Sequence, residues 1–228
     1  MSQTPFRIVE ALFPDLTQLD FTGPHQVLSR LPGTEVIMAS LAGGPVEADC
    51  LTFANSVRLE DINGCDLLVV PGGLGVAAAM NSEPFMAEVK RLGAGATYLA
   101  SICTGSLILG AAGFLKGRRA ACHWGWRDLL PLFGAIPDEA RVVRDGNVIT
   151  GGGVTAGIDL ALTIAAEVAG PDVAQTIQLT LEYAPAPPFN AGRPETAPPH
   201  ILAAVRKHLE QAAPDRTESA RRAVLAMA

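Results

Sequence analysis

Short apolar segments alternate with helical patterns, and this alternation restricts the fold of the chain more than any other feature. Four of the segments indicate strands, at residues 7–12, 35–40, 66–70 and 97–102. Continuous apolar runs are typical of strands that are buried on both faces of a parallel sheet. Strands that alternate with helices form such a sheet with a helical layer on each face. We therefore expect an α/β sandwich of three layers around a mostly parallel sheet.

The remaining segments fit the same plan. Hairpins are predicted at 46–55 and 142–150, a further strand at 120–123, and helices at 25–31, 83–92, 104–112, 127–132, 155–169, 173–182 and 200–211. Residues 184–199 contain six prolines and are expected to form a loop, and the chain from residue 213 onward is expected to be partly helical and weakly constrained. No linker or repeat interrupts the pattern, so we expect a single domain over 1–228, with the loop 184–199 and the helices of 200–228 as its extension.

Composition narrows the classes of function. The 228 residues are 49% hydrophobic and 18% charged, so the chain can bury a large core, and no apolar run is long enough to cross a membrane. A net charge of −6 argues against nucleic-acid binding, which requires a basic surface. The four cysteines have no zinc-binding spacing, and no signal peptide is evident. We expect a cytoplasmic protein that holds no metal.

Cys103 lies where a predicted buried strand gives way directly to a predicted helix. A side chain at such a corner is held up, exposed and often strained, as the nucleophile is in other elbow motifs. The backbone N–H groups that follow, together with the helix dipole, would lower the pKa of the thiol and favour the reactive thiolate. The alternative is a buried structural cysteine, because free cysteines are among the most buried residues.

Partners for this thiol come from other strand ends. Gly72 and Gly73 follow the strand at 66–70, and without a Cβ they allow close approach of a small ligand. The N–H groups of Gly73 and Thr104 are candidates for stabilising developing charge, although an ordinary glycine turn is the alternative. Asp20 is the candidate proton donor if burial and a nearby thiolate raise its pKa, and a helix-capping role is the alternative. His123 could form a Cys–His dyad or could be a packed structural residue.

Several motifs together resemble those of the DJ-1/PfpI superfamily. They are residues 66–73, which end in Pro71-Gly72-Gly73, and residues 101–106, which contain Cys103. The resemblance covers roughly residues 7–182 and implies a flavodoxin-like sandwich that is usually dimeric. Further segments, at 18–25, 122–124, 151–159 and 181–192, are similar to the isocyanide hydratase branch of the superfamily.

The resemblance implies a covalent mechanism without a cofactor. Cys103 would be the nucleophile, Asp20 the acid and base, and Thr104 their neighbour, with Gly72 and Gly73 binding substrate. We expect four further residues to lie around this catalytic group: His123, Trp124, Gly152 and Val154. The implied activity is hydration of a small-molecule isocyanide by a homodimer, with no nucleic acid or membrane as partner. The alternatives are a glyoxalase or deglycase that uses the same cysteine and a non-enzymatic redox or stress sensor.

Two departures from the superfamily pattern bear on this expectation. Many members have Glu where this chain has Asp20, and the protease-like branch has His where this chain has Thr104. The second difference argues against a peptidase. Some relatives carry a DNA-binding domain after this fold, and the stretch that follows residue 182 is too short for that double module.

Overall fold

An eight-stranded sheet forms the centre of the protein in this computed structural model, which describes residues 4–227. The strand order is β3-β4-β2-β1-β5-β6-β10-β9. All the inner pairs are parallel, and only the edge strands β3 and β9 run antiparallel to their neighbours. The strands are β1 (Phe6–Leu12), β2 (Thr34–Ser40), β3 (Gly44–Ala48), β4 (Leu51–Arg58), β5 (Leu67–Val70), β6 (Tyr98–Ile102), β9 (Val142–Asp145) and β10 (Val148–Gly151).

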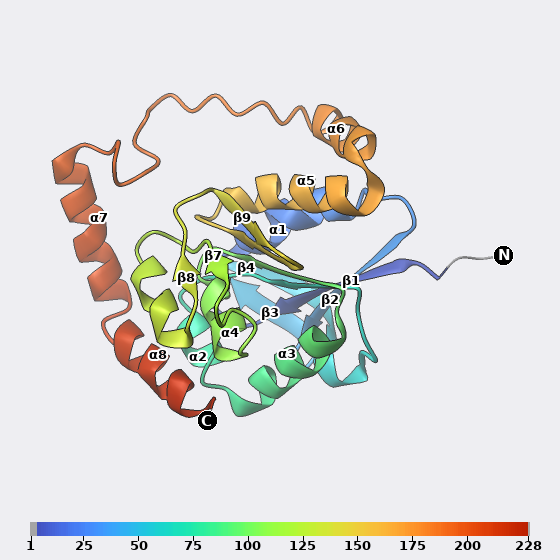
Figure 1. Ribbon diagram of the computed structural model, residues 1–228, viewed down its shortest axis with the longest axis horizontal. Coiled ribbons are helices and arrows are strands. Elements are labelled where there is room, and N and C mark those ends of the chain that lie inside the picture. The colour runs from blue at the N-terminus through green and yellow to red at the C-terminus, as the bar shows by residue number, and fades with distance from the viewer. Residues whose placement is uncertain (1–3, 228) are drawn as a thin grey trace.

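Helices cover both faces of this sheet, as Figure 1 shows. One layer consists of α1 (Gln18–Leu28), α5 (Ala156–Ala169) and α6 (Pro171–Thr180). The other contains α2 (Val76–Ala79), α3 (Glu83–Gly95), α4 (Gly105–Ala111), the 3₁₀ helix η2 (Arg127–Phe133) and α8 (Arg216–Leu225). A 3₁₀ turn, η1 (Leu59–Asp61), follows β4. The expected three-layer, flavodoxin-like α/β sandwich is confirmed.

The apolar run of β5 shows why the sheet needs both helical layers. All four of its residues are buried. Because side chains alternate along a strand, Leu67 and Val69 join the core beneath α1 and α5, whereas Leu68 and Val70 join the core on the opposite face. A strand buried on both faces therefore appears in the sequence as a continuous apolar segment.

Helix α1 starts earlier than predicted, at Gln18 instead of residue 25. The sequence Thr22-Gly23-Pro24 predicts a turn, but Gly23 and Pro24 lie inside the helix and are buried. A Cβ on Gly23 would lie 3.2 Å from Ile158 of α5, and one on Gly157 would lie 2.9 Å from the Pro24 ring. Close packing of α1 on α5 thus overrides the local turn preference, and it places Asp20 in the first helical turn.

Two other expectations are corrected. The strand predicted at 120–123 is only β7 (Arg119–Ala120), which pairs with β8 (Ile136–Pro137) outside the main sheet. The end of the chain is not weakly constrained, because Ala220 and Ala223 of α8 are buried in the core beside η2. Helix α8 has little hydrophobic signal in the sequence, because most of its residues are polar and its two alanines reach the core only through close approach.

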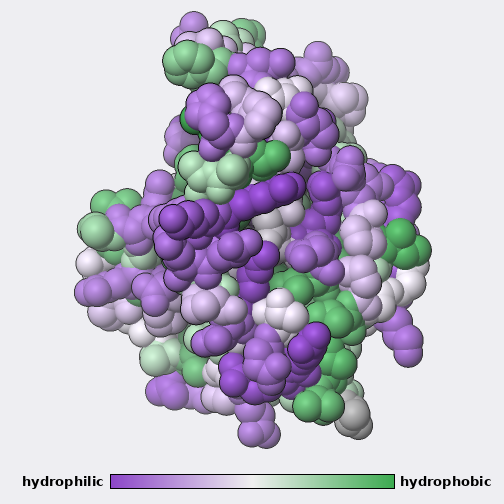
Figure 2. Space-filling model, turned by 90° about the vertical axis from the view of Figure 1, so that its left-hand side faces the viewer, coloured by the Kyte–Doolittle hydropathy of each residue, from purple (hydrophilic) through white to green (hydrophobic). Residues whose placement is uncertain are grey.

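The loop 184–199 runs over the surface to α7 (Pro199–Ala212), which lies at one end of the molecule in Figure 1. Helix α7 has no fully buried residue. Figure 2 looks onto this side of the molecule and shows mainly hydrophilic residues with scattered apolar patches. Within residues 4–227, no helix combines the length and the apolar character that crossing a bilayer requires.

Candidate active site

Cys103 occupies a strained corner directly after β6. Its φ angle is 58°, in the left-handed region that costs a non-glycine residue about 1–3 kcal/mol. The Cys103 N–H donates to the carbonyl of Gly151 at 3.1 Å, and the Cys103 carbonyl accepts from the His123 N–H at 3.2 Å. Helix α4 begins two residues later, at Gly105. The predicted strained strand-to-helix elbow is therefore present and is held from both sides by backbone hydrogen bonds.

The environment of the Cys103 sulfur differs from the expectation of an exposed thiol with a lowered pKa. The residue is only 5% exposed. Burial raises the pKa of the thiol well above its usual range, and the nearby charge of Asp20 raises it further, while the Thr104 N–H acts in the opposite direction. The backbone N–H group does lower the pKa of the thiol, as the sequence suggests, but desolvation raises this pKa by more. The thiol therefore needs a base close by if it is to react.

Asp20 faces this thiol from the first turn of α1. Its side chain is completely buried, and its Oδ2 accepts the Gly72 N–H at 2.9 Å. Its Oδ1 has no hydrogen-bond partner among the described residues. Burial raises the pKa of Asp20 from 3.8 to about 7, against the opposing influence of the Gly72 N–H and the Cys103 thiol. A carboxyl group with this pKa can accept or donate a proton near neutral pH.

Gly72, Gly73 and Thr104 join the ends of β5 and β6. The Gly73 N–H donates to Thr104 Oγ1 at 2.8 Å, and Thr104 Oγ1 donates to the Gly73 carbonyl at 3.1 Å. A Cβ on Gly72 would lie 2.4 Å from the Thr104 nitrogen and 2.9 Å from Asp20 Oδ2, so only glycine fits there. The N–H groups of both glycines are engaged within the protein. Gly72 and Gly73 therefore position Asp20 and Thr104, while the Thr104 N–H is directed at the sulfur.

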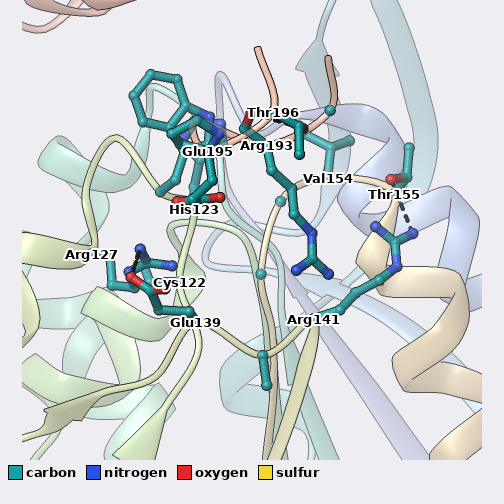
Figure 3. Close-up of a pocket in the computed structure, with 16 residues that line it drawn as sticks. Cys122, His123, Arg127, Glu139, Arg141, Val154, Thr155, Arg193, Glu195 and Thr196 are labelled. Atoms are coloured by element: carbon teal, nitrogen blue, oxygen red, sulfur yellow. Dashed lines mark hydrogen bonds and ion pairs between the residues drawn. The ribbon is translucent and has the colours of Figure 1, made fainter. Parts of the chain in front are cut away.

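The expected outer residues lie beside this centre and line a cavity of about 470 Å³ (Figure 3). His123, Trp124, Gly152 and Val154 all contribute to its wall. Burial lowers the pKa of His123, and its Nδ1 accepts the Gly125 N–H at 3.2 Å. A neutral imidazole that is engaged in this way favours the interpretation of His123 as a packed structural residue over that of a Cys–His dyad.

The charged residues of the cavity wall were not foreseen from the sequence. Arg127, Glu139 and Arg141 come from the segment between β7 and β9, and Arg193 and Glu195 come from the loop 184–199. These segments are distant in sequence and have no motif in common. The one sequence signal for these wall residues is Arg193, which is the single cationic residue of the proline-rich loop 184–199. In residues 4–227, no group of three or more His, Cys, Asp or Glu side chains gathers in a way that could hold a metal ion.

A buried cysteine on a strained elbow and an acid with a raised pKa meet at the carboxyl edge of a parallel sheet. Together they define an α/β protein with a cysteine nucleophile elbow. Comparison with known families is more specific. The chain belongs to the DJ-1/PfpI family, whose model matches residues 7–167.

Individual relatives support the same assignment. An isonitrile hydratase of Pseudomonas putida is 49% identical over 213 residues, which is 93% of each chain. The crystal structure of a THiJ/PfpI family protein from Pseudomonas syringae has a TM-score of 0.91 and 40% identity, covering 95% of this chain and 90% of that one. The structure of DJ-1beta from Drosophila melanogaster has a TM-score of 0.69 and 26% identity, covering 79% of this chain and 100% of that one.

Proposed function

We propose that the protein is an isonitrile hydratase, which adds water to an isocyanide, R–N≡C, and releases the N-substituted formamide, R–NH–CHO. The observation that carries the proposal is the enclosed pairing of Cys103 with Asp20, in a chain that is 49% identical over 93% of its length to an isonitrile hydratase. Isocyanide hydration needs a nucleophile for the terminal carbon and a group that moves one proton to that carbon. Cys103 and Asp20 supply these two functions.

In the first half of the reaction, Cys103 and Asp20 share one proton. The Asp20 carboxylate takes the proton of the thiol, and the sulfur attacks the terminal carbon of the isocyanide. Asp20 then returns the proton to that carbon, which gives a thioimidate, R–N=CH–S, on Cys103. The Thr104 N–H stabilises charge on the sulfur before the attack. The raised pKa of Asp20 matches this exchange, because proton transfer is most efficient when the pKa of the acid lies near the working pH.

In the second half, water adds to the thioimidate carbon while the Asp20 carboxylate accepts one of its protons. Asp20 passes this proton to the substrate nitrogen. The carbon–sulfur bond then breaks, the hydroxyl proton returns to the sulfur through Asp20, and the formamide leaves. Isocyanide and water supply every atom of the product, and the reaction is redox-neutral, so it consumes no cofactor.

The direct test is incubation of the protein with a small neutral alkyl isocyanide, with formamide followed by NMR or mass spectrometry. Formamide production with multiple turnovers is expected. A parallel incubation uses methylglyoxal as the substrate. Consumption of methylglyoxal, with no formamide from the isocyanide, would replace the proposal by a glyoxalase or deglycase activity. No turnover of either substrate, with reversible oxidation of Cys103, would identify a redox sensor instead.

The pH dependence follows from the shared proton. The reactive state holds one proton between Asp20 and Cys103, so it is lost when Asp20 is protonated below its pKa of about 7. We expect kcat/KM to fall about tenfold per pH unit below pH 7, roughly 100-fold at pH 5. It should stay level above pH 7 until the thiol titrates. A profile that is flat from pH 5 to pH 8 would contradict the pairing.

We further propose that the protein forms a homodimer. Leu179 of α6 and Phe189 of the following loop are 82% and 80% exposed, and apolar side chains this exposed favour burial against a second copy. Analytical ultracentrifugation should give the mass of a dimer, and a monomer at micromolar concentration would refute this.

We also propose a cytoplasmic location, because a reactive thiol is maintained in a reducing compartment. Cell fractionation tests it.

A further inference from the structure

Three arginines and two glutamates line the cavity beside the Cys103 elbow. The chain has a net charge of −6, yet Arg127, Arg141 and Arg193 all line this one cavity of about 470 Å³. It adjoins the elbow through Gly152 and through His123, whose N–H bonds the Cys103 carbonyl. The cavity wall and the Cys103 elbow are therefore joined through the backbone.

The three arginines differ in how far the protein itself neutralises them. Arg127 pairs with Glu139 at 2.8 Å. Arg141 uses Nε for Asp159 at 2.5 Å and Nη2 for Thr155 at 3.1 Å, and its guanidinium also interacts with Tyr183. Two of the three cations are therefore at least partly satisfied before any ligand binds.

Arg193 differs from the other two. Its guanidinium donates no hydrogen bond and forms no ion pair within the described part of the chain, and the adjacent Glu195 bonds to neither Arg193 nor Arg141. Its backbone is fixed instead, because the Arg193 carbonyl accepts the N–H groups of Thr196 at 3.1 Å and Ala197 at 2.9 Å. Figure 3 shows the Arg193 side chain extending from the loop into the cavity, toward the side on which Arg141 lies.

We propose that the preferred substrates are isocyanides whose R group carries a carboxylate, and that Arg193 binds this carboxylate while the isocyano carbon lies at Cys103. This inference rests on the proposed hydratase function and names its substrate class. A guanidinium presents parallel N–H donors that match the two oxygens of a carboxylate. Arg141, which lines the same cavity, adds a second cation there. The formamide product keeps the carboxylate, so the same contacts bind an N-formyl amino acid.

The test compares kcat/KM for ω-isocyano carboxylates, with one to four methylene groups, with kcat/KM for their methyl esters. The wild-type protein should prefer the best carboxylate over its ester by about 5- to 10-fold. Arg193→Met should remove that preference, because it should lower kcat/KM for the carboxylates much more than for the esters. Arg221→Met, which removes an exposed cation on α8 outside the cavity, should retain it. Raising the salt concentration from about 0.01 M to about 1 M should also reduce the preference, because charges across a solvated cavity are screened.

The outcomes separate this inference from the function on which it rests. If the esters are hydrated and the carboxylates have an equal or lower kcat/KM, the inference is overturned and the hydratase function stays intact. A carboxylate preference that survives in Arg193→Met would also overturn it, because the selectivity would come from elsewhere. If no isocyanide in the series is hydrated, the proposed function fails and the inference fails with it. Weaker binding of N-formylglycine to Arg193→Met than to wild type, measured by calorimetry, supports the contact independently of turnover.

Discussion

Replacing Cys103 by alanine is expected to lower the rate of formamide production by about 10⁶-fold, because loss of a covalent nucleophile has effects of this size in other enzymes. Without the sulfur no thioimidate can form. Cys103→Ser should be almost as inactive, because a hydroxyl holds its proton more tightly than a thiol does and Asp20, with a pKa of about 7, is too weak a base to remove it. Single-turnover formamide measurements at saturating isocyanide check both variants.

A matched control is Cys65→Ala. Cys65 is also buried, and burial raises the pKa of its thiol to about 12, but it lies in the core away from Asp20. This variant should lose about 1 kcal/mol of stability and keep its turnover. Circular dichroism and thermal unfolding should show that all three variants fold. Turnover close to wild type in a folded Cys103→Ala protein would exclude the covalent mechanism.

The sheet and its two helical layers could be predicted from the sequence because their signals are local. The alternate residues of β5 are buried on opposite faces, so the strand is visible as an apolar run. The start of α1 was harder to predict from the sequence. Its start depends on the contact of Gly23 and Pro24 with α5, which lies more than a hundred residues further along the chain. Local residue preferences favour a turn there, and only the tertiary packing produces a helix.

The candidate site was predictable to a similar degree. The elbow at Cys103 and the strand end at Gly72 are marked by glycine next to apolar runs, and the structure brings both together with Asp20. The electrostatics were not predictable, because desolvation depends on how many side chains surround the sulfur. A sequence shows the N–H groups next to Cys103 but not the packing that buries it, so the predicted direction of the pKa shift of the thiol was wrong.

The Asp20→Asn variant should lose turnover by about 10²- to 10⁴-fold, the usual range for a general acid or base. Asparagine keeps the size of the side chain, and its carbonyl oxygen can still accept the Gly72 N–H. It cannot take the proton of the Cys103 thiol or return it to carbon. The fall in kcat/KM below pH 7 should disappear together with the rate, because that fall reports the ionisation of Asp20. Measuring kcat/KM from pH 5 to pH 8 in both proteins checks this.

The same substitution should make the protein more stable at neutral pH. The pKa of Asp20 is 3.8 in the unfolded chain and about 7 in the fold. Between these values the folded protein keeps a proton that the unfolded chain releases, so wild-type stability falls as the pH rises from about 4 to about 7 and stays low above pH 7. Asparagine has no charge to bury. At pH 8 the variant should therefore gain stability, by at most about 4 kcal/mol, and at pH 4 the two proteins should be nearly equal.

Opposite changes in activity and stability distinguish a proton-transfer residue from a structural one. If Asp20 only held the loop at Gly72, its replacement would lower turnover and the free energy of unfolding together. Urea unfolding at pH 4 and pH 8, combined with the rate measurements, separates the two cases. Asp20→Glu completes the comparison. It restores the acid, but the close fit between Gly72, Thr104 and the carboxylate leaves little space for another methylene, so it should recover part of the rate and none of the added stability. An Asp20→Asn protein that is less stable than wild type at pH 8 would show that the buried carboxylate is held for structure.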